Sequence, residues 1–569
     1  MADESPWDVA DQAVGAIAPE VAEFGNPDIA EFARALAAAV RGSVLHPVAS
    51  FGAALRLVTR LAPLPPIAVG RWFGAELESH VDVDPKDRRF ADPAWSDNPV
   101  FYSLRLMYEI AGHYGDELVD GSGVDALTRE KAGVALGLLH DSLAPSNFHL
   151  TNPAVIKRAI DTAGKSVVDG AWNFVDDVLH NGGRPRQVDT SSFVLGKNLA
   201  ATPSKVVYRN ELMELLQYDP NTPKVHANPL LFSPPWINKY YVMDLAPGRS
   251  FVEWAVNHDR TVFAISYRNP GPEQAHVTLD EYLVHGPRQA LDVVEDITGA
   301  QTIDVVGLCL GGAMTAITAA YLNAKGDSRV GALTLLNTLL DYSDPGVLRV
   351  FTDRRAVERL EKQMAREGYL PGASMATTFD LLRPNDLIFN YVVSNWLMGQ
   401  QPPAFDILAW NADSTRLPAA MHSFYLRNFY VENSLAKGRL ELAGEPIRLA
   451  GIKQDTYLVG AENDHIVPWR SAYAAIRLMS GPVRFVLSSG GHIAGIVNPP
   501  GPKGWYLVAD ETPQSASEWR EKAARHAGSW WEDWVGWSRE HAGPLVDPPP
   551  LGSDAYPVMC DGPGDYIRT

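Results

Sequence analysis

The sequence predicts an α/β fold with a helical insertion, preceded by a mainly helical N-terminal domain. Up to about residue 190, apolar residues recur at spacings of three and four, as in "PDIAEFARALAAAVRG", which is the period of an α-helix. Beyond that point, short apolar runs alternate with longer helix-period stretches, which is typical of a parallel sheet with crossover helices. We therefore expect a helical domain over residues 1–190 and an α/β domain over residues 191–569.

Short apolar runs mark the strands expected in the second domain. They lie at residues 230–232, 261–266, 303–306, 333–336, 456–459 and 484–487. The connection between the fourth and fifth runs, residues 341–451, is far longer than the usual ~2–6 residues and predicts an insertion with its own structure. Two interpretations stay open: a helical cap with an apolar underside, or an extra helical layer whose rings fill its own core. The aromatic residues of the insertion include Phe389, Tyr391, Trp396, Phe405, Trp410, Phe424, Tyr425, Phe429 and Tyr430.

Charge and cysteine content limit the classes of function. The chain has 49 Lys and Arg residues against 68 Asp and Glu residues, a net charge of −19. This balance disfavours a nucleic-acid binder, because no basic excess offsets the phosphates. The two cysteines, Cys309 and Cys560, form neither a disulfide framework nor a metal-ligand pattern. We therefore expect a reducing, intracellular setting and no metal site.

Both ends of the chain carry further expectations. The first residues, "MADESPWDVADQ", lack the basic start and apolar core of a signal peptide, and residues 55–69 are apolar but interrupted by arginine and proline. We expect a cytoplasmic protein without an integral membrane segment. Near the other end, "HAGSWWEDWVGWSREHAG" has tryptophans at helical spacing, which predicts a helix that docks its indoles into the core. The Pro- and Gly-rich residues after it are expected to form a loosely held tail.

The segment "IDVVGLCLGGAM" combines an apolar run, a cysteine between glycines and a helix-like pattern. It is a G-x-C-x-G version of the nucleophile elbow of the α/β-hydrolase fold, in which a strand turns sharply into a helix. Gly307 and Gly311 fit, because the tight turn leaves no room for Cβ atoms on either side of the nucleophile. Cys309 is therefore the candidate nucleophile, and the positive end of the helix would favour its thiolate. The alternative is a buried cysteine that happens to lie between glycines.

Candidate partners of Cys309 follow in the chain order expected of this fold, an acid after a later strand and then a histidine after the last one. "DTYLVGAENDHIVPW" delivers Asp464 beyond a predicted strand, and "VRFVLSSGGHIAGIVNPP" delivers His492 in a Gly-rich loop. His465 is a rival base, but side chains of neighbouring residues diverge, so Asp464 would not orient it. Glu462 is a rival acid. The chain order favours Asp464 and His492.

These residues predict acyl transfer through a covalent intermediate. His492 would take the proton of Cys309 as a general base and return it to the leaving group. The oxyanion is expected to bind the backbone amides of Leu310, directly after the nucleophile, and of Ile237 in the loop "LLFSPPWINKYY". A thiol can receive an acyl group from a thioester at almost no cost in free energy and still hold it activated. The cysteine therefore indicates transfer from an acyl thioester onto an alcohol, in a dry pocket that suppresses hydrolysis.

Motifs far from the elbow resemble one family, the poly(3-hydroxyalkanoate) synthases, which polymerise 3-hydroxyacyl-CoA into polyester. The resemblance spans about residues 89–537. The matching stretches are "RFADPAWSDNPVFYSLRLMY", "DSLAPSNFHLTNP", "KVVYRNELMELLQY", "PLLFSPPWINKYYVMDL", "FAISYRNP", "NDLIFNYVV", "WNADSTRLPAAMHSFYLRN", "GAENDHIVPW", "SGGHIAGIVNPP" and "GSWWEDW".

The resemblance implies roles for individual residues. The family's nucleophile, catalytic aspartate and catalytic histidine fall on Cys309, Asp464 and His492. Trp410 looks like a tryptophan of the family's dimer-linked cap region. The resemblance also implies 3-hydroxyacyl-CoA as substrate without a further cofactor, a homodimer, and an N-terminal domain for dimerisation or association with polyester granules. The elbow "GLCLGGAM" is similar to that of the single-subunit type with short-chain substrates such as 3-hydroxybutyryl-CoA.

Two other functions stay open. One is a thioesterase or depolymerase-like hydrolase on the same scaffold, which would release free acid instead of polymer. The other is a non-catalytic granule-coat protein, against which the complete set of Cys309, Asp464 and His492 argues. Lys239 and Arg268 are possible contacts for the CoA phosphates, and each fits a structural ion pair equally well.

The cysteine count bears on how a polymer would grow. Passing the chain between two thiols of one subunit requires a second reactive cysteine, and Cys560 lies in the expected tail. We therefore expect elongation to use Cys309 alone, through a transient unattached acyl-CoA species, or together with the Cys309 of a neighbouring subunit.

Overall fold

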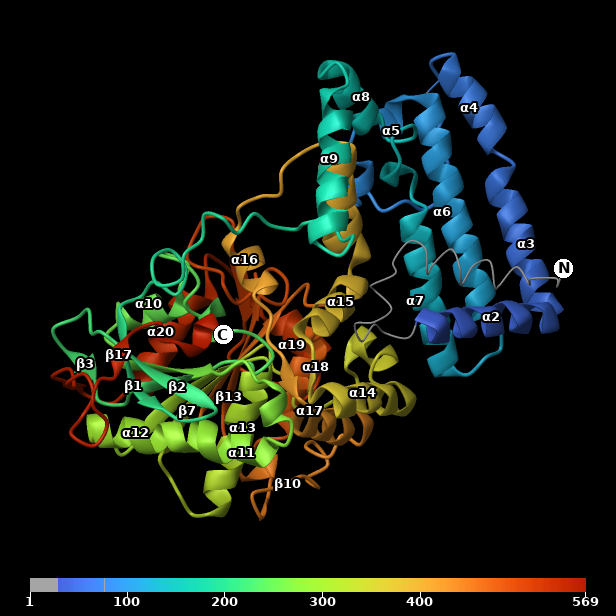
Figure 1. Ribbon diagram of the computed structural model, residues 1–569. Helices are drawn as coiled ribbons and strands as arrows, with labels where there is room; N and C mark the ends of the chain where they lie inside the picture. Colours follow the sequence, from blue (N-terminus) through green and yellow to red (C-terminus); the bar gives the residue numbers. More distant parts are fainter. Residues whose placement is uncertain (1–28, 76) are drawn as a thin grey trace. The chain divides into compact units, whose positions relative to one another are not determined.

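The computed structural model describes residues 29–75 and 77–569, and these divide into two compact units (Figure 1). The first unit comprises the described residues up to Asp189 together with Ala376–Pro403. The second comprises Thr190–Met375 and Ala404–Thr569. The sequence-based division assigned residues 376–403 to the insertion of the α/β domain, whereas the structure groups them with the N-terminal helices.

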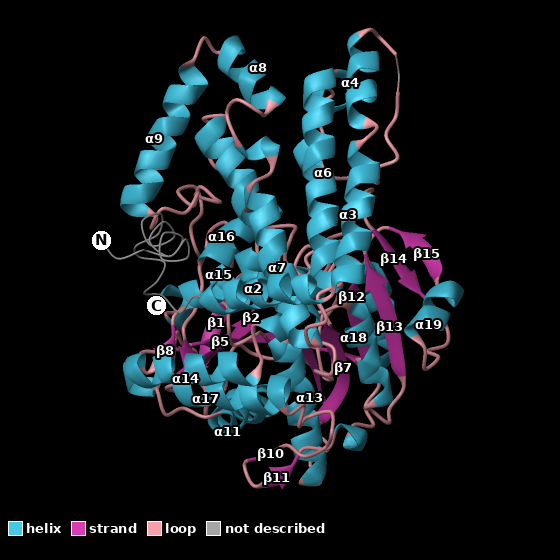
Figure 2. Ribbon diagram, turned by 90° about the vertical axis from the view of Figure 1, so that its right-hand side faces the viewer, coloured by secondary structure: helices cyan, strands magenta, loops and turns pink. Residues whose placement is uncertain are grey.

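The first unit is helical, as predicted, and α6 (Pro99–Asp120) lies at its centre. This helix contacts α2, α3, α4 and α7, all labelled in Figure 2, and also α5. The Asn98 side chain caps it by accepting hydrogen bonds from the amides of Val100 and Phe101, and Pro99 suits the first turn, where an amide would have no intrahelical acceptor. The other helices are α2 (Ile29–Leu45), α3 (Pro47–Leu61), α4 (Leu64–Trp72), α5 (Ala94–Asp97), α7 (Ala126–Ser142), α8 (Pro153–Asp161) and α9 (Lys165–His180).

Residues 376–403 join the first unit by packing against α9. They include two π-helical turns, η7 (Asn385–Phe389) and η8 (Val392–Leu397). A Cβ at Gly170 of α9 would lie 2.0 Å from the carbonyl oxygen of Trp396, so glycine permits the close approach. The Trp396 indole donates to Asp177 Oδ2 at 2.8 Å, and Asn173 Nδ2 donates to the Asn395 carbonyl oxygen at 3.0 Å. These bonds to α9 explain why this part of the insertion leaves the α/β unit.

The second unit contains an 11-stranded sheet whose central strands were all predicted. Its order is β15-β14-β13-β12-β7-β6-β4-β5-β2-β1-β17, and the strands from β13 to β5 run parallel. Each reads as a nearly continuous apolar run, because helices cover both faces of a parallel sheet. These strands are β4 (Leu230–Ser233), β5 (Val262–Tyr267), β6 (Ile303–Leu308), β7 (Val330–Leu336), β12 (Thr456–Ala461) and β13 (Val483–Ser488).

Antiparallel strands extend the sheet at both edges, and the sequence patterns did not reveal them. β2 (Met213–Tyr218) and β1 (Ser204–Arg209) follow β5, while β14 (Trp505–Val508) and β15 (Ala524–Ala527) follow β13. Small separate sheets pair β3 (Val225–His226) with β16 (Leu545–Val546), β8 (Tyr369–Leu370) with β9 (Leu417–Pro418), and β10 (Glu441–Leu442) with β11 (Glu445–Pro446).

The expectation of a loosely held tail is wrong. β17 (Cys560–Asp561) pairs with β1 at the edge of the sheet. Glu214, fully buried in β2, accepts hydrogen bonds from the amides of Asp565 and Tyr566, both at 3.0 Å. Ile567 is buried as well. Side-chain bonds hold the tail too, such as the ion pair of Asp565 with Arg209 at 2.6 Å. Its Pro- and Gly-rich composition therefore gives little indication of its order.

Helices cover both faces of the large sheet (Figure 1). α12 (Gln289–Thr298) and α13 (Leu310–Ala324) pack on one face, and α10 (Phe251–Val256) and α20 (Trp530–His541) pack on the other. The Trp534 indole of α20 donates to Thr334 Oγ1 of β7 at 2.9 Å, while Leu333 and Leu335 join the core on the side of α13. This alternation follows from the pleat of the strand. The buried indoles of α20, whose docking was predicted, belong to Trp530, Trp531 and Trp534.

The remaining α-helices surround the sheet or belong to the insertion. They are α11 (Leu279–Leu283), α14 (Arg354–Glu367), α15 (Gly372–Leu382), α16 (Asp406–Ala412), α17 (Ala419–Tyr425), α18 (Trp469–Tyr473) and α19 (Ala516–Lys522). Over the described part of the chain, no helix combines the length and the apolar character needed to cross a bilayer.

We expect Asp304→Ala to lower the free energy of unfolding by ~3–5 kcal/mol, because it leaves a buried cation without its partner. Asp304 in β6 pairs with Arg260 at 2.6 Å, and their side chains are 5% and 2% exposed. Glu432→Ala removes the partner of the exposed Arg354 and should cost less than about 1 kcal/mol. Denaturant unfolding followed by tryptophan fluorescence measures both changes, and equal losses would contradict the expectation.

Candidate active site

Cys309 lies at the sharp turn between β6 and α13. Its φ is +52°, in the left-handed region that a residue with a Cβ rarely adopts. The Cys309 amide donates to the Leu336 carbonyl oxygen of β7 at 2.8 Å. Its own carbonyl oxygen accepts hydrogen bonds from the amides of Gly312 at 3.0 Å and Ala313 at 3.1 Å. The structure thus has the strand, turn and helix that the sequence pattern predicts around this cysteine.

Glycines on both sides make the turn possible. A Cβ at Gly307 would lie 2.5 Å from the Gly311 carbonyl oxygen. A Cβ at Gly311 would lie 2.0 Å from the Ser233 carbonyl oxygen, and one at Gly312 would lie 1.8 Å from Thr338 Oγ1. A side chain at Gly307 would therefore push the first turn of α13 away, and side chains at Gly311 and Gly312 would displace the ends of the neighbouring strands. The contact at Gly311 also brings the end of β4 beside the first turn of α13.

The structure brings the predicted acid and base together. His492, in the loop after β13, donates from Nδ1 to Asp464 Oδ2 at 2.7 Å. The Asp464 side chain, in the loop after β12, is completely buried, and its Oδ1 accepts hydrogen bonds from the amides of Ile466 and Val467 at 2.9 Å. The His492 side chain also interacts with Cys309. All three residues singled out from the sequence therefore meet at one place.

The two rivals have other places in the structure. Glu462 forms a bidentate ion pair with Arg520, at 2.7 and 2.8 Å. The Asp464 carboxylate is bonded to His492, and the adjacent His465 is half-buried in the same loop. The geometry therefore selects Asp464 and His492 as the pair that faces the cysteine.

The charge state of His492 follows from its neighbours. Burial of the ring by itself favours the neutral form, but the Asp464 carboxylate and then Cys309 outweigh it. Together they hold the pKa of His492 well above its ordinary value. An imidazolium at this place would stabilise a negative charge on the Cys309 sulfur.

Aromatic residues of the insertion form a wall close to Cys309. The ring of Tyr342, in the segment after β7, lies 6.2 Å from that of Tyr425, 5.4 Å from that of Phe429 and 4.9 Å from that of Tyr430. Burial raises the pKa of Tyr342 and of Tyr430, and a negative charge on Cys309 adds to both shifts, so both phenols lie within electrostatic range of the sulfur. The rings of Tyr342, Tyr425 and Phe429 belong to the core cluster against which Cys309 packs, so this part of the insertion combines features of both expected arrangements. Residues 376–403, in contrast, pack in the first unit.

The two amides expected to bind an oxyanion come from different elements. Leu310 is the first residue of α13, and the first amides of a helix have no intrahelical acceptor. Ile237 is half-buried in the loop after β4, which the contact at Gly311 brings beside that helix end. Trp410, buried within the chain, donates from its indole to the Lys239 carbonyl oxygen of the same loop at 2.8 Å. The insertion and the loop after β4 are thus bonded to each other.

The two possible phosphate contacts have partners within the protein. Lys239 is buried, which lowers its pKa, and its Nζ donates to the carbonyl oxygens of Tyr566 at 3.3 Å and Thr569 at 2.6 Å. Arg268 pairs with Glu273 at 3.2 Å. Lys239 therefore ties the C-terminal segment to the loop after β4 instead of facing solvent.

Sequence reasoning missed the groups that hold the loop of His492. Trp530 and Trp531 donate from their indoles to the carbonyl oxygens of Gly495 at 3.0 Å and Ile496 at 2.9 Å. The available signal was chemical, because a buried indole N–H normally requires an acceptor. The spacing of the tryptophans predicted their burial but not which loop would accept these bonds.

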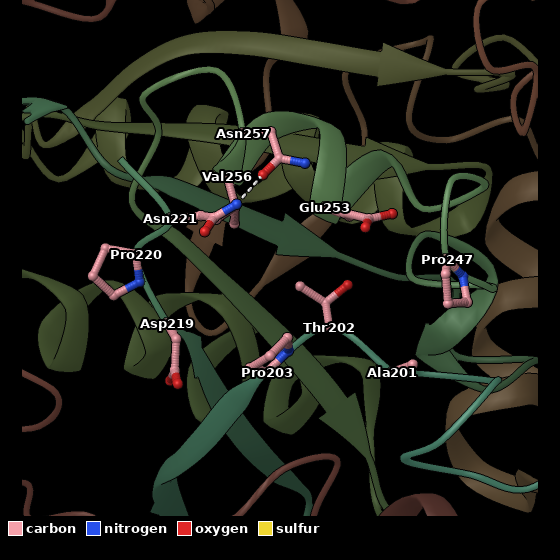
Figure 3. Close-up of a pocket in the computed structure, with 10 residues that line it drawn as sticks. All are labelled: Ala201, Thr202, Pro203, Asp219, Pro220, Asn221, Pro247, Glu253, Val256 and Asn257. Carbon is pink, nitrogen blue, oxygen red and sulfur yellow. Dashed lines mark hydrogen bonds between the residues drawn. The ribbon is translucent and has the colours of Figure 1, made fainter. Parts of the chain in front are cut away.

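A separate hollow of about 310 Å³ lies elsewhere on the second unit (Figure 3). Among its lining residues, Asn221 Nδ2 donates to Asn257 Oδ1 at 2.5 Å. The lining includes Asp219 and Glu253 and no basic side chain, so it does not suit the phosphates of an acyl-CoA. None of the predicted site residues lines it.

We expect Asp464→Asn to lower the pKa of His492, because the carboxylate is the group that most favours the charged ring. Since the folded-state pKa lies above the unfolded value, the pair stabilises the fold fully below about pH 6.5 and this contribution is lost as the pH rises through the folded-state pKa. NMR titration of the histidine rings measures the shift. Glu462→Gln, at a carboxylate already engaged by Arg520, is the control and should leave the His492 pKa unchanged.

Comparison with known proteins places the chain in a family. Residues 86–255 match the family model described as "Poly-beta-hydroxybutyrate polymerase (PhaC) N-terminus", and residues 234–499 match "alpha/beta hydrolase fold". The "Poly(3-hydroxyalkanoate) polymerase" of Methylorubrum extorquens is 39% identical over 99% of this chain and 94% of its own length. The "Poly(3-hydroxyalkanoate) polymerase subunit PhaC" of Cupriavidus necator is 41% identical, over 85% of this chain and 83% of its own. A solved structure, "Alpha/beta hydrolase domain-containing protein 10 from mouse", is 16% identical with a TM-score of 0.31, and covers 52% of this chain and 95% of that one. The chain therefore belongs to the poly(3-hydroxyalkanoate) polymerases, acyltransferases built on an α/β-hydrolase fold.

Proposed function

We propose that the protein polymerises 3-hydroxyacyl-CoA into a polyester and releases CoA, with the growing chain held on Cys309. The observation that supports this most is the elbow cysteine beside the buried pair of His492 and Asp464, in a chain whose relatives are named as poly(3-hydroxyalkanoate) polymerases. The proposal includes short-chain substrates such as 3-hydroxybutyryl-CoA, because the elbow resembles that of the single-subunit type that uses them. The chemistry requires no metal and no dissociable cofactor, because a thiol, an imidazole and a carboxylate carry every step.

Loading transfers the acyl group from CoA to the cysteine. The Cys309 sulfur attacks the thioester carbonyl carbon while His492 holds the thiol proton. The bond from that carbon to the CoA sulfur then breaks, and His492 returns the proton to the departing CoA. In between, the amides of Leu310 and Ile237 stabilise the negative charge on the carbonyl oxygen. Asp464 stabilises the imidazolium throughout.

Elongation transfers the chain from the cysteine to a hydroxyl group. The 3-hydroxyl of an incoming unit attacks the acyl group on Cys309, and His492, supported by Asp464, accepts the hydroxyl proton. The bond to the Cys309 sulfur breaks, the sulfur regains that proton, and the lengthened chain is briefly an unattached acyl-CoA. A second attack by Cys309 on this thioester releases CoA and reloads the chain. One sulfur is sufficient for this cycle, and exchange between the cysteines of neighbouring subunits would use the same bond changes.

Competition with water decides between polymer and free acid. The aromatic wall of Tyr342, Tyr425, Phe429 and Tyr430 lies close to Cys309. In the proposed reaction these rings would keep water away from the acyl-cysteine. The burial of His492 and Asp464 would likewise keep water away from the imidazole that acts as the base. A hydrolase would need a positioned water in this place, so the wall favours transfer to an alcohol.

The proposal includes a homodimer, which light scattering of the protein in solution would detect.

The proposal also includes attachment to polyester granules in the cytoplasm. One face of α3 supports the attachment. Val48, Phe51, Leu55 and Val58, here called the α3 strip, are spaced by three and four residues and are 86%, 72%, 55% and 60% exposed. An apolar polymer surface would remove this strip from water.

We expect Cys309→Ala to reduce CoA release from 3-hydroxybutyryl-CoA by at least about 10³-fold, because no other group can carry the acyl chain. A thiol reagent follows CoA release, and insoluble polymer and free acid are separated and quantified. Free acid as the main product of the parent enzyme would favour the hydrolase. CoA release that survives in Cys309→Ala would contradict the role of the cysteine.

Cys560→Ser is the matched control and should leave the polymer yield intact. Cys560 is half-buried in β17 next to Arg209, and burial raises the pKa of its thiol, which makes it a weak nucleophile at neutral pH. A collapse of polymer yield in this variant would show that elongation needs a second thiol.

We expect the variant V48S/F51S/L55S to bind isolated polyester granules at least about tenfold more weakly, because each apolar side chain contributes roughly 1.5–3 kcal/mol when it leaves water. Sedimentation of granules with bound protein measures the partition. V100S/M107S, at two exposed apolar residues of α6, is the control. Equal partition of the parent and the triple variant would rule out the α3 strip.

A further inference from the structure

Asn337 lies where three parts of the active site meet. It directly follows β7 with a φ of +44°, and it is completely buried. Its amide donates to the Val459 carbonyl oxygen of β12 at 2.8 Å, and its side-chain Nδ2 donates to the carbonyl oxygen of His492 at 2.5 Å. The residue before it, Leu336, accepts the hydrogen bond of the Cys309 amide. Leu336 and Asn337 are thus bonded to the elbow, to the strand before the acid and to the loop of the base.

Several hydrogen bonds anchor the loop of His492, and the bond from Asn337 is the one at the histidine itself. Before it, the Gly490 carbonyl oxygen accepts the amide of Asn463 at 2.9 Å, and after it the indole of Trp530 bonds Gly495. The neighbouring carbonyl oxygens of Gly491 and Ile493 accept amides of the same loop, whereas that of His492 accepts the Asn337 side chain. The position of the His492 peptide sets where its ring begins. Because Asp464 fixes Nδ1 of that ring, a shift of the peptide would tilt the imidazole with respect to the Cys309 sulfur.

Asparagine meets both demands of this position. It tolerates a left-handed φ better than most residues, and its amide can donate to a carbonyl group. Glycine would satisfy the backbone but offers no donor. An ionised aspartate would satisfy the backbone and place a negative charge beside the carbonyl oxygen.

We infer that Asn337 is a positioning residue for the proposed reaction, whose side-chain amide holds the His492 backbone and thereby sets the imidazole against the Cys309 sulfur. This role rests on the proposed function of Cys309 and His492. Asn337 itself contacts no reacting atom.

The test compares the parent, Asn337→Gly and Asn337→Asp, each in a Cys560→Ser background so that Cys309 is the only thiol. Asn337→Gly should lower kcat for CoA release about tenfold or more with little change in KM, since a displacement of ~1 Å can cost as much as ~10²-fold. The alkylation ratio is the rate at which iodoacetamide alkylates Cys309 at about pH 6.5 divided by the rate at about pH 9. Asn337→Gly should lower this ratio, because thiolate formation at low pH depends on the neighbouring imidazole. Asn337→Asp, which is isosteric, should act in the same direction.

Asn228→Gly is the matched control. Asn228 Nδ2 also donates to a histidine carbonyl oxygen, that of His541 at the end of α20, at 2.8 Å. This variant should lower Tm without changing kcat or the alkylation ratio. If the Asn337 variants also lose only Tm, or equal the parent, the inference is overturned. A parent whose Cys309 is alkylated but which releases no CoA would count against the proposed function. The difference in alkylation ratio between the parent and Asn337→Gly would still decide the role of Asn337.

Discussion

The backbone turn at Cys309 is the constraint on which the rest of the site depends. A residue with a Cβ is held at a φ of +52°, and the turn closes only because Gly307, Gly311 and Gly312 leave room for Ser233, Thr338 and the helix itself. These contacts join the ends of three neighbouring strands, β4, β6 and β7. The loop with the expected oxyanion amide follows β4 on one side of β6, and Asn337 follows β7 on the other side.

Electrostatics explains why the acid and base are buried as a pair. A buried imidazole alone would stay neutral and a buried carboxylate alone would be costly, but each stabilises the other across 2.7 Å. Two backbone amides satisfy the remaining oxygen of Asp464. The loop of His492 is bonded in turn to Asn337 and to the indoles of α20. An imidazole held in this way can approach the sulfur without rearrangement of the chain.

Much of this could be predicted from the sequence. The central strands produce apolar runs because both faces of a parallel sheet are covered, and Cys309, Asp464 and His492 follow those strands in the order the fold requires. The edge strands and the C-terminal segment could not be predicted, because they are held largely by backbone bonds to distant residues such as Glu214. The insertion was predicted as one piece. Its division between two units depends on Gly170 and Asp177, which lie in a helix about two hundred residues earlier.

The sequence by itself determined the elbow, the chain order of the three candidate catalytic residues and the central strands, because these depend on local spacing and on side-chain chemistry. Only the tertiary structure decided that Asp464 bonds His492, that Glu462 is taken by Arg520, and that Lys239 is buried against the C-terminal segment. It also decided that Asn337 and two tryptophans hold the histidine loop. The physical reason is that these partners are far apart in the chain, so their pairing depends on how the strands are ordered in the sheet and on which side chains the folded core leaves room for.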